Sequence, residues 1–131
     1  MISVLLVDDY APWRQYIGAT LAADPELKVV GEAADGLEAI AKAGELKPDV
    51  VLLDISLPDL NGLAVALRIS EQVPLAKILI LSQQNDEDLV DAALNAGASG
   101  FVLKTARSAE LLSAIRCAFR GEARVGPADR L

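Results

Sequence analysis

The run DVVLLD (residues 49–54) decides the fold of this 131-residue chain, because four consecutive apolar residues stand between two aspartates. A strand with one face in water alternates apolar and polar residues, whereas a strand covered on both faces is apolar throughout. Four other runs are short and rich in Val, Leu and Ile: ISVLLV (2–7), LKVVGEA (27–33), AKILILS (76–82) and SGFVLK (99–104). Together they predict the strands of a parallel sheet that is buried on both faces.

Helical patterns separate these strands and fix the fold class. The expected helices cover residues 11–23, 36–46, 60–71, 86–96 and 107–120. Five strand–helix units predict an α/β domain, a (βα)5 doubly wound parallel five-stranded sheet in the order 2-1-3-4-5 within a three-layer α/β/α arrangement. A barrel would need eight units. We expect the domain to cover residues 1–120 and residues 121–131 to form a C-terminal tail or the start of a linker.

Several residues mark the ends of the expected helices. Asp86 and Ser108 are candidate N-caps, since their short polar side chains can accept a hydrogen bond from the first helical turn. Gly97 follows the fourth helical pattern and suits a left-handed helix terminator. These residues set the expected boundaries within a residue or two.

Composition excludes several classes of function. Twelve basic and nineteen acidic residues give a net charge of −7, which argues against nucleic-acid binding by this domain and against binding to an anionic membrane. The chain has no histidine, so histidine-based catalysis and histidine metal ligands are excluded. Its single cysteine, Cys117, cannot form a disulfide within the chain, and we expect a reducing, cytoplasmic compartment.

Polar residues gather where the expected strands end. The first strand is followed by Asp8 and Asp9, the third ends in Asp54, the fourth ends in Ser82, and the fifth ends in Lys104. Ligands of open α/β sheets bind beyond the carboxyl ends of the strands, so these side chains should meet. Crowded carboxylates are tolerated when a cation offsets their repulsion, and oxygen ligands favour Mg²⁺ or Mn²⁺. The set suits phosphoryl transfer with Asp54 as the nucleophile.

At this point the chain resembles response-regulator receiver domains of the CheY-like kind over residues 1 to about 120. The resemblance rests on LLVDDY, LLDISLPDLNG, ILILS and AGASGFVLK, and on the spacing of Asp54, Pro58 and Gly62. EAADGLEAI and AGASGFVLK are most similar to receivers that precede a LuxR-type helix-turn-helix output domain. The resemblance implies a flavodoxin-like fold and two-component signal transduction.

The resemblance also implies a role for each site residue. Asp54 accepts the phosphoryl group. Asp9, Asp54 and the backbone carbonyl of Ser56 ligate the metal, and Asp8 acts through a metal-bound water. Lys104 and Ser82 bind the phosphoryl group.

Other implied roles concern the switch and its duration. Ser82 and Phe101 form the switch, in which Phe101 moves inward. Ser56, Gln83 and Gln84 occupy positions that tune the lifetime of the phosphorylated state, and Gln83 stands where the family usually has a smaller residue.

The implied phosphoryl donor is a sensor histidine kinase or a histidine phosphotransfer protein. Trp13, Tyr16, Ile17 and Leu21 form a stripe on the first helix, the region where such partners dock in the family. A homodimer is also compatible with the resemblance. The domain is expected to be no enzyme beyond weak self-phosphorylation from small donors and autodephosphorylation. Its output is expected to be transcription if a DNA-binding domain follows in the full-length protein.

Three alternatives stay open at this stage. A haloacid-dehalogenase-type enzyme also uses an aspartate and Mg²⁺, but it needs D-x-D after its first strand, where this chain has adjacent aspartates. A flavin or cobalamin module would need a phosphate loop or a histidine ligand. A receiver that only binds partners and is never phosphorylated would also share this fold.

Overall fold

Strands and helices alternate along the whole of the computed structural model, which describes residues 1–84, 86–122 and 124–125, the last two by their backbone alone. The first half of the chain forms β1 (Ile2–Val7), α1 (Ala11–Ala22), β2 (Leu27–Ala33), α2 (Gly36–Leu46) and β3 (Val50–Asp54). The second half forms α3 (Gly62–Gln72), β4 (Lys77–Ser82), α4 (Glu87–Asn95), β5 (Gly100–Leu103), α5 (Ser108–Phe119) and β6 (Arg124–Val125).

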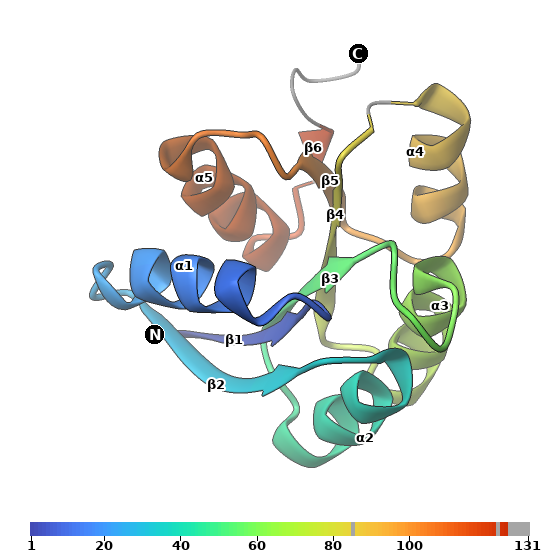
Figure 1. The fold of residues 1–131 in the computed structure, drawn as a ribbon, viewed down its shortest axis with the longest axis horizontal. Helices are drawn as coiled ribbons and strands as arrows, with labels where there is room; N and C mark the ends of the chain where they lie inside the picture. The colour runs from blue at the N-terminus through green and yellow to red at the C-terminus, as the bar shows by residue number, and fades with distance from the viewer. Residues whose placement is uncertain (85, 123, 126–131) are drawn as a thin grey trace.

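The sheet has the predicted winding. Its order is β2-β1-β3-β4-β5-β6, with every pair parallel. Helices α1 and α5 cover one face, and α2, α3 and α4 cover the other (Figure 1). The predicted flavodoxin-like α/β/α fold with the order 2-1-3-4-5 is therefore confirmed.

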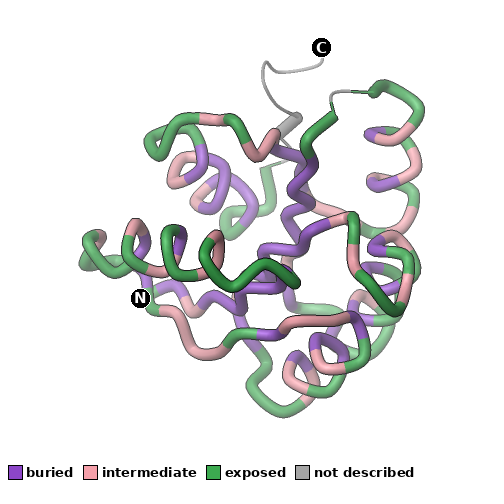
Figure 2. The backbone as a smooth tube through the Cα atoms, viewed as in Figure 1, coloured by how far each residue is buried: buried purple, intermediate pink, exposed green. Residues whose placement is uncertain are grey.

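Burial on both faces explains the consecutive apolar residues of β3. Leu53 packs into the core under α2, α3 and α4, whereas its neighbour Leu52 packs into the core under α1 and α5. All five residues of β3 are buried, and the central strands form the buried middle of the domain (Figure 2). Successive residues of a strand point to opposite faces of the sheet. Because both faces are covered by helices, consecutive residues of the strand are apolar.

Two of the three predicted helix signals are confirmed. Asp86 caps α4, and its side chain accepts hydrogen bonds from the backbone N–H groups of Asp88 (2.8 Å) and Leu89 (3.4 Å). Gly97 has a φ of 97° after the last turn of α4. The N–H of Ala98 donates to the carbonyl of Ala93 over 3.0 Å, which closes that turn in the manner of a Schellman motif.

The prediction that Ser108 caps α5 is wrong. Arg107 holds the N-cap position with an extended backbone (φ −66°, ψ 155°), and Ser108 is the first helical residue. The Ser108 hydroxyl instead lies 3.4 Å from the hydroxyl of Tyr16 on α1. The expected strand at 99–104 is also shorter, since β5 ends at Leu103 and Lys104 follows it.

The segment expected to be a tail or linker contributes a sixth strand. Gly100 pairs with Arg124 and Phe101 with Val125, so β6 lies parallel to β5 at the edge of the sheet. Residues 123 and 126–131 lie outside the described residues, and the domain boundary at residue 120 stays a prediction. In the described part of the chain, no helix has both the length and the apolar character needed to cross a membrane.

A carboxylate ties the loop after β3 to helix α2. Asp59 accepts hydrogen bonds from the backbone N–H groups of Gly36 (2.7 Å) and Leu37 (3.0 Å). These are free donors of the first turn of α2, where a negative charge is favourable. The hydrogen bond from Gly36, with smaller contributions from Leu37 and Leu60, lowers the pKa of Asp59 below its ordinary value.

This contact predicts a pH-dependent contribution to stability. A pKa lowered by folding stabilises the protein at pH values above the unfolded pKa, about 3.9 for Asp, and this contribution is lost as the pH falls through the folded pKa. We expect Asp59→Asn to lower the urea midpoint of unfolding at pH 7 and to differ much less from wild type at about pH 3. Glu45→Gln, an exposed acid at the other end of α2, is the control. An equal loss at both pH values would contradict the prediction.

Candidate functional site

Five polar side chains from four strands meet at the carboxyl-terminal rim of the sheet. Asp8 and Asp9 follow β1, Asp54 ends β3, Ser82 ends β4 and Lys104 follows β5. All five line one cavity.

Three of these residues form an acidic cluster. Carboxylate oxygens of Asp8, Asp9 and Asp54 lie within 4.8 Å of one another. The structure therefore brings together the five residues that the sequence predicted to converge.

Lys104 is the cation of this cluster. Its ammonium lies 2.5 Å from Oδ2 of Asp8 and 3.3 Å from Oδ2 of Asp54. Asp8 is fully buried and Asp54 is 4% exposed, whereas Asp9 is exposed. One ammonium cannot neutralise three carboxylates, so the cluster keeps an excess of negative charge, and solvent screens the buried carboxylates of Asp8 and Asp54 poorly.

Burial dominates the electrostatics of Asp54. It raises the pKa of the Asp54 carboxyl above its ordinary value, and the nearby Asp8 carboxylate adds to the rise in pKa. The backbone N–H of Ser56 donates to Oδ1 of Asp54 over 3.0 Å, and together with the charge of Lys104 it lowers the pKa in opposition. Each effect has the sign expected from desolvation, like charge or hydrogen bonding to the anion.

Trp13 is also a neighbour of the site, whereas the sequence predicted only that it lies on the surface of the first helix where a phosphoryl donor docks. Its ring, on the first turns of α1, lies 4.8 Å from the ammonium of Lys104. A cation over an aromatic ring is attracted by the negative face of the ring. Trp13 thus adds an aromatic contact to the two carboxylates that surround the Lys104 ammonium. The only signal in the sequence was its place four residues after Asp9, near the start of the expected first helix.

The other predicted residues, Ser82, Ser56, Gln83 and Gln84, line the same cavity as Asp54. The Ser82 hydroxyl accepts a hydrogen bond from the backbone N–H of Gln84 (3.0 Å), and Ser82 is almost fully buried. Gln83, Gln84 and Ser56 are exposed and line the same cavity as Asp54. They therefore form part of the solvent-exposed lining of the cavity that contains Asp54.

Phe101 does not line this cavity. It pairs with Ile80 across β4 and β5 and is fully buried in the core under α2, α3 and α4. Its side chain is already inward, so the structure shows no outward position from which it would move. The predicted switch role of Phe101 stays a prediction.

Gly62 lets the loop after Asp54 fold tightly. A side chain on Gly62 would lie 2.6 Å from the backbone of Ile55, the residue after Asp54. The N–H of Gly62 donates to the carbonyl of Ile55 over 3.2 Å, and Ser56 and Asn61 form a bridge across the loop. The spacing of Asp54 and Gly62 therefore has a steric reason.

The acidic cluster fits a hard divalent cation. It offers carboxylate oxygens only, and the chain has no histidine to add a softer ligand. Oxygen ligands of this kind suit Mg²⁺ and Mn²⁺ and do not favour zinc. The excess negative charge described above supplies the electrostatic reason for a cation to bind there.

A doubly wound sheet with an acidic cluster, a hydroxyl and a lysine on its carboxyl-terminal rim defines a CheY-like receiver. The family model of the response regulator receiver domain matches residues 4–116, and the chain belongs to this family. Such domains work in two-component, phosphorylation-dependent signal transduction.

Known proteins agree with this assignment. The chain is 40% identical to the transcriptional regulatory protein LiaR of Bacillus subtilis over 93% of its own length, and it spans 58% of that relative. A LuxR-family response regulator structure from Aurantimonas sp. SI85-9A1 is 34% identical with a TM-score of 0.90, covering 94% of this chain and 89% of that one. The response regulator domain of Thermotoga maritima CheB is 37% identical with a TM-score of 0.84, covering 92% and 97%.

The electrostatics of Asp54 predict a gain of stability when its charge is removed. Because folding raises its pKa, the ionised carboxylate lowers stability at pH 7, and the contribution of this group rises as the pH falls. We expect Asp54→Asn to raise the free energy of unfolding in EDTA, because Asn is neutral and Lys104 keeps its pairing with Asp8. Urea unfolding measures this. Asp9→Asn, at an exposed position, should change stability less, and a less stable Asp54→Asn would refute the argument.

Proposed function

We propose that Asp54 accepts a phosphoryl group from a sensor histidine kinase or a histidine phosphotransfer protein in a Mg²⁺-dependent reaction. An Asp54 oxygen attacks phosphorus, the bond from phosphorus to the donor nitrogen breaks, and an aspartyl phosphate forms. One observation carries the proposal: Asp54 lies beside Asp8 and Asp9 and 3.3 Å from Lys104, in a cavity open to solvent. Positioning and charge neutralisation are what phosphoryl transfer requires.

Asp54 is favoured over Asp8 by its contacts. Both carboxylate oxygens of Asp8 accept strong hydrogen bonds, Oδ1 from the N–H of Tyr10 (2.8 Å) and Oδ2 from Lys104 (2.5 Å). Asp8 is also fully buried. Oδ2 of Asp54 is only loosely paired at 3.3 Å, so it is the better nucleophile.

The other residues support the reaction by charge and hydrogen bonding. Mg²⁺ would be held by Asp9, Asp54 and the carbonyl of Ser56, with Asp8 acting through a water, and when bound it neutralises and orients phosphoryl oxygens. Lys104 pairs with the phosphoryl group from the opposite side. Ser82 donates its hydroxyl hydrogen to a phosphoryl oxygen, and this contact couples the site to Phe101.

The domain acts as a switch and not as a turnover enzyme. We propose slow phosphorylation from small donors and slow loss of the phosphoryl group to water. Ser56, Gln83 and Gln84 control the access of water because they are exposed side chains at the mouth of the cavity.

The output is proposed to be transcription. The net charge of −7 argues against DNA binding by this domain, so a DNA-binding domain elsewhere in the full-length protein would carry that function. LiaR is named a transcriptional regulatory protein, and the chain spans little more than half of its length. The LuxR-family structure points to the same kind of output.

Phosphorylation from acetyl phosphate tests the proposal directly. With Mg²⁺ we expect one phosphoryl adduct on wild type by intact mass, released by hydroxylamine as for an acyl phosphate. Asp54→Asn and wild type in EDTA should show none. Asp9→Asn should need more Mg²⁺, because it keeps the nucleophile and loses a ligand. An adduct that persists in Asp54→Asn would move the acceptor to another residue, and no adduct from acetyl phosphate or a kinase would reject the function.

The exposed side chain of Gln83 predicts a change in lifetime. Gln83→Ala removes bulk from the mouth of the cavity, so water should reach the aspartyl phosphate more easily and its half-life should shorten several-fold. Buffer exchange first removes the donor and Mg²⁺, and Mg²⁺ is then added back to start the decay. The measurement is the fraction of phosphorylated protein, followed over time by intact mass. Asn95→Ala, at an exposed position on α4 away from the cavity, is the control. A lifetime unchanged or longer would show that Gln83 does not shield the site.

A further inference from the structure

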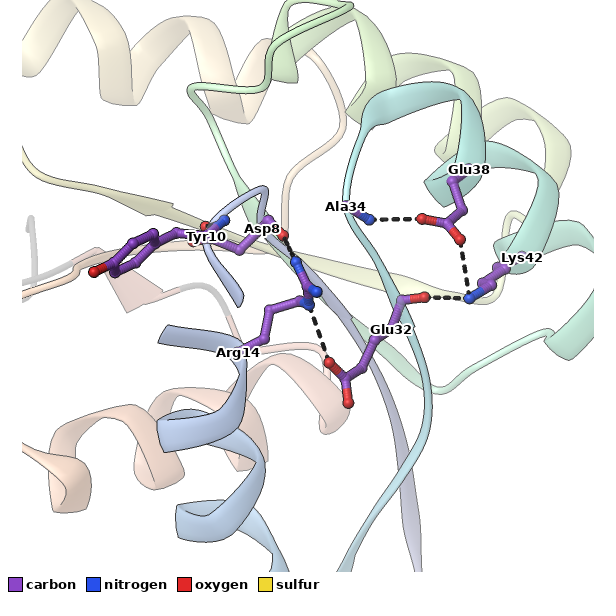
Figure 3. A network of polar contacts seen from close by, with 7 residues as sticks. All are labelled: Asp8, Tyr10, Arg14, Glu32, Ala34, Glu38 and Lys42. Atoms are coloured by element: carbon purple, nitrogen blue, oxygen red, sulfur yellow. Dashed lines mark hydrogen bonds and ion pairs between the residues drawn. The ribbon is translucent and has the colours of Figure 1, made fainter. Parts of the chain in front are cut away.

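Arg14 links the acidic doublet, Asp8 and Asp9, to β2. Its guanidinium Nη1 donates to the backbone carbonyl of Asp8 over 2.5 Å, and its Nε lies 3.0 Å from Oε1 of Glu32 (Figure 3). The Arg14 side chain is 17% exposed. A guanidinium has donors in a rigid fork, so it can hold two acceptors in a fixed relation to each other.

This contact completes the fixing of the Asp8 backbone. The N–H of Asp8 donates to the carbonyl of Ala33 over 3.1 Å, which continues the pairing of β1 with β2. The Asp8 carbonyl belongs to the same planar peptide unit as the N–H of Asp9. Holding that oxygen therefore fixes the direction in which Asp9 leaves β1, and with it the separation of the Asp8 and Asp9 carboxylates.

Arg14 acts from behind the site. The cavity around Asp54 is lined by Asp8, Asp9 and Trp13, and Arg14 does not line it. Arg14 lies instead over a groove between α1 and β2, together with Glu32. It therefore has no place among the groups that would touch a cation or a phosphoryl group.

Glu32, the acceptor on the far side of Arg14, is itself anchored. Its backbone carbonyl accepts a hydrogen bond from the ammonium of Lys42 on α2. Lys42 also pairs with Glu38 over 3.2 Å, and Glu38 accepts from the N–H of Ala34 over 2.7 Å. Figure 3 shows this chain of contacts running from Asp8 through Arg14 to α2. The guanidinium is thus held against a fixed part of the domain.

We propose that Arg14 is a positioning residue for the acidic cluster: through the Asp8 carbonyl it sets the geometry with which Asp8 and Asp9 bind a divalent cation. The inference rests on the proposed function, because it concerns the same metal site. It is separate from the chemistry, since Arg14 contacts neither a ligand atom nor the nucleophile.

The sign of the effect distinguishes positioning from simple electrostatics. Arg14 carries a positive charge near the carboxylates, so its charge alone opposes cation binding, and Arg14→Gln would then bind Mg²⁺ more tightly. Positioning predicts the reverse. Loss of a partner that orients metal ligands typically weakens affinity, and we expect the dissociation constant for Mg²⁺ in Arg14→Gln to rise roughly 10-fold.

A charge-balanced double variant sharpens this test. Arg14→Gln with Glu32→Gln leaves the net charge of the domain unchanged, so electrostatics predicts little change in affinity. Positioning predicts a loss as large as that of Arg14→Gln alone. Isothermal titration with Mg²⁺ measures the affinities, and circular dichroism checks that each variant is folded.

Two further variants serve as controls. Arg116→Gln removes an arginine that bridges Asp24 and Glu26 at the other end of the sheet, so it should bind Mg²⁺ as wild type does. Arg14→Lys keeps the charge but replaces the rigid guanidinium fork by a single ammonium nitrogen, so its affinity should fall between wild type and Arg14→Gln. It also provides the comparison if Arg14→Gln does not fold.

Kinetics separates this inference from the proposed function. In phosphorylation by acetyl phosphate, the Mg²⁺ concentration for half-maximal rate should rise in Arg14→Gln, while the rate at saturating Mg²⁺ stays close to wild type. If wild type itself binds no Mg²⁺, both proposals are overturned. If wild type binds Mg²⁺ and is phosphorylated, but neither Arg14 variant is weakened, the positioning role alone is overturned.

Discussion

The ammonium of Lys104 lies between the buried carboxylates of Asp8 and Asp54, and the rim of the sheet is organised around this unequal pairing. The carboxylates of Asp8 and Asp54 are taken out of water, the exposed carboxylate of Asp9 lies close by, and one ammonium offsets these charges only in part. The burial of apolar side chains on both faces of the sheet offsets the free-energy cost of this arrangement. The remaining negative charge makes the rim suitable for a hard cation.

The register of the parallel strands determines which residues reach this rim. Val7 pairs with Leu53 in the β1–β3 ladder, so the next residues, Asp8 and Asp54, lie at the same height. Ser82 pairs with Leu103, which places Lys104 one residue beyond the end of β5. β3 is apolar up to Asp54, and β4 is apolar from Ile78 up to Ser82, so in these central strands a polar side chain appears where the strand leaves the covering helices. Burial on both faces thus collects the chemistry at one edge.

The same regularity explains what the sequence could predict. Short runs rich in apolar residues, clearest in β3 and β4, predicted the strands. The ends of β1, β3, β4 and β5 then predicted the acidic cluster, Ser82 and Lys104. Other features depend on contacts without a local pattern. β6 has two residues, too few for a periodic signal, and Ser108 turned out to face Tyr16 rather than to cap α5. The contacts of Trp13 with Lys104 and of Arg14 with the Asp8 carbonyl exist only after α1 has packed on the sheet.

These contacts make the two sides of the site unequal. On the β1 side, Asp8 is held through its N–H, its carbonyl and both carboxylate oxygens. On the β4 side, the Ser82 hydroxyl accepts from the N–H of Gln84, and a hydroxyl that accepts one bond can still donate its hydrogen. A phosphoryl oxygen could therefore gain a donor from Ser82 without breaking that contact. Because more contacts hold Asp8 than hold the Ser82 hydroxyl, we expect a response to new charge on Asp54 to involve Ser82 more than Asp8.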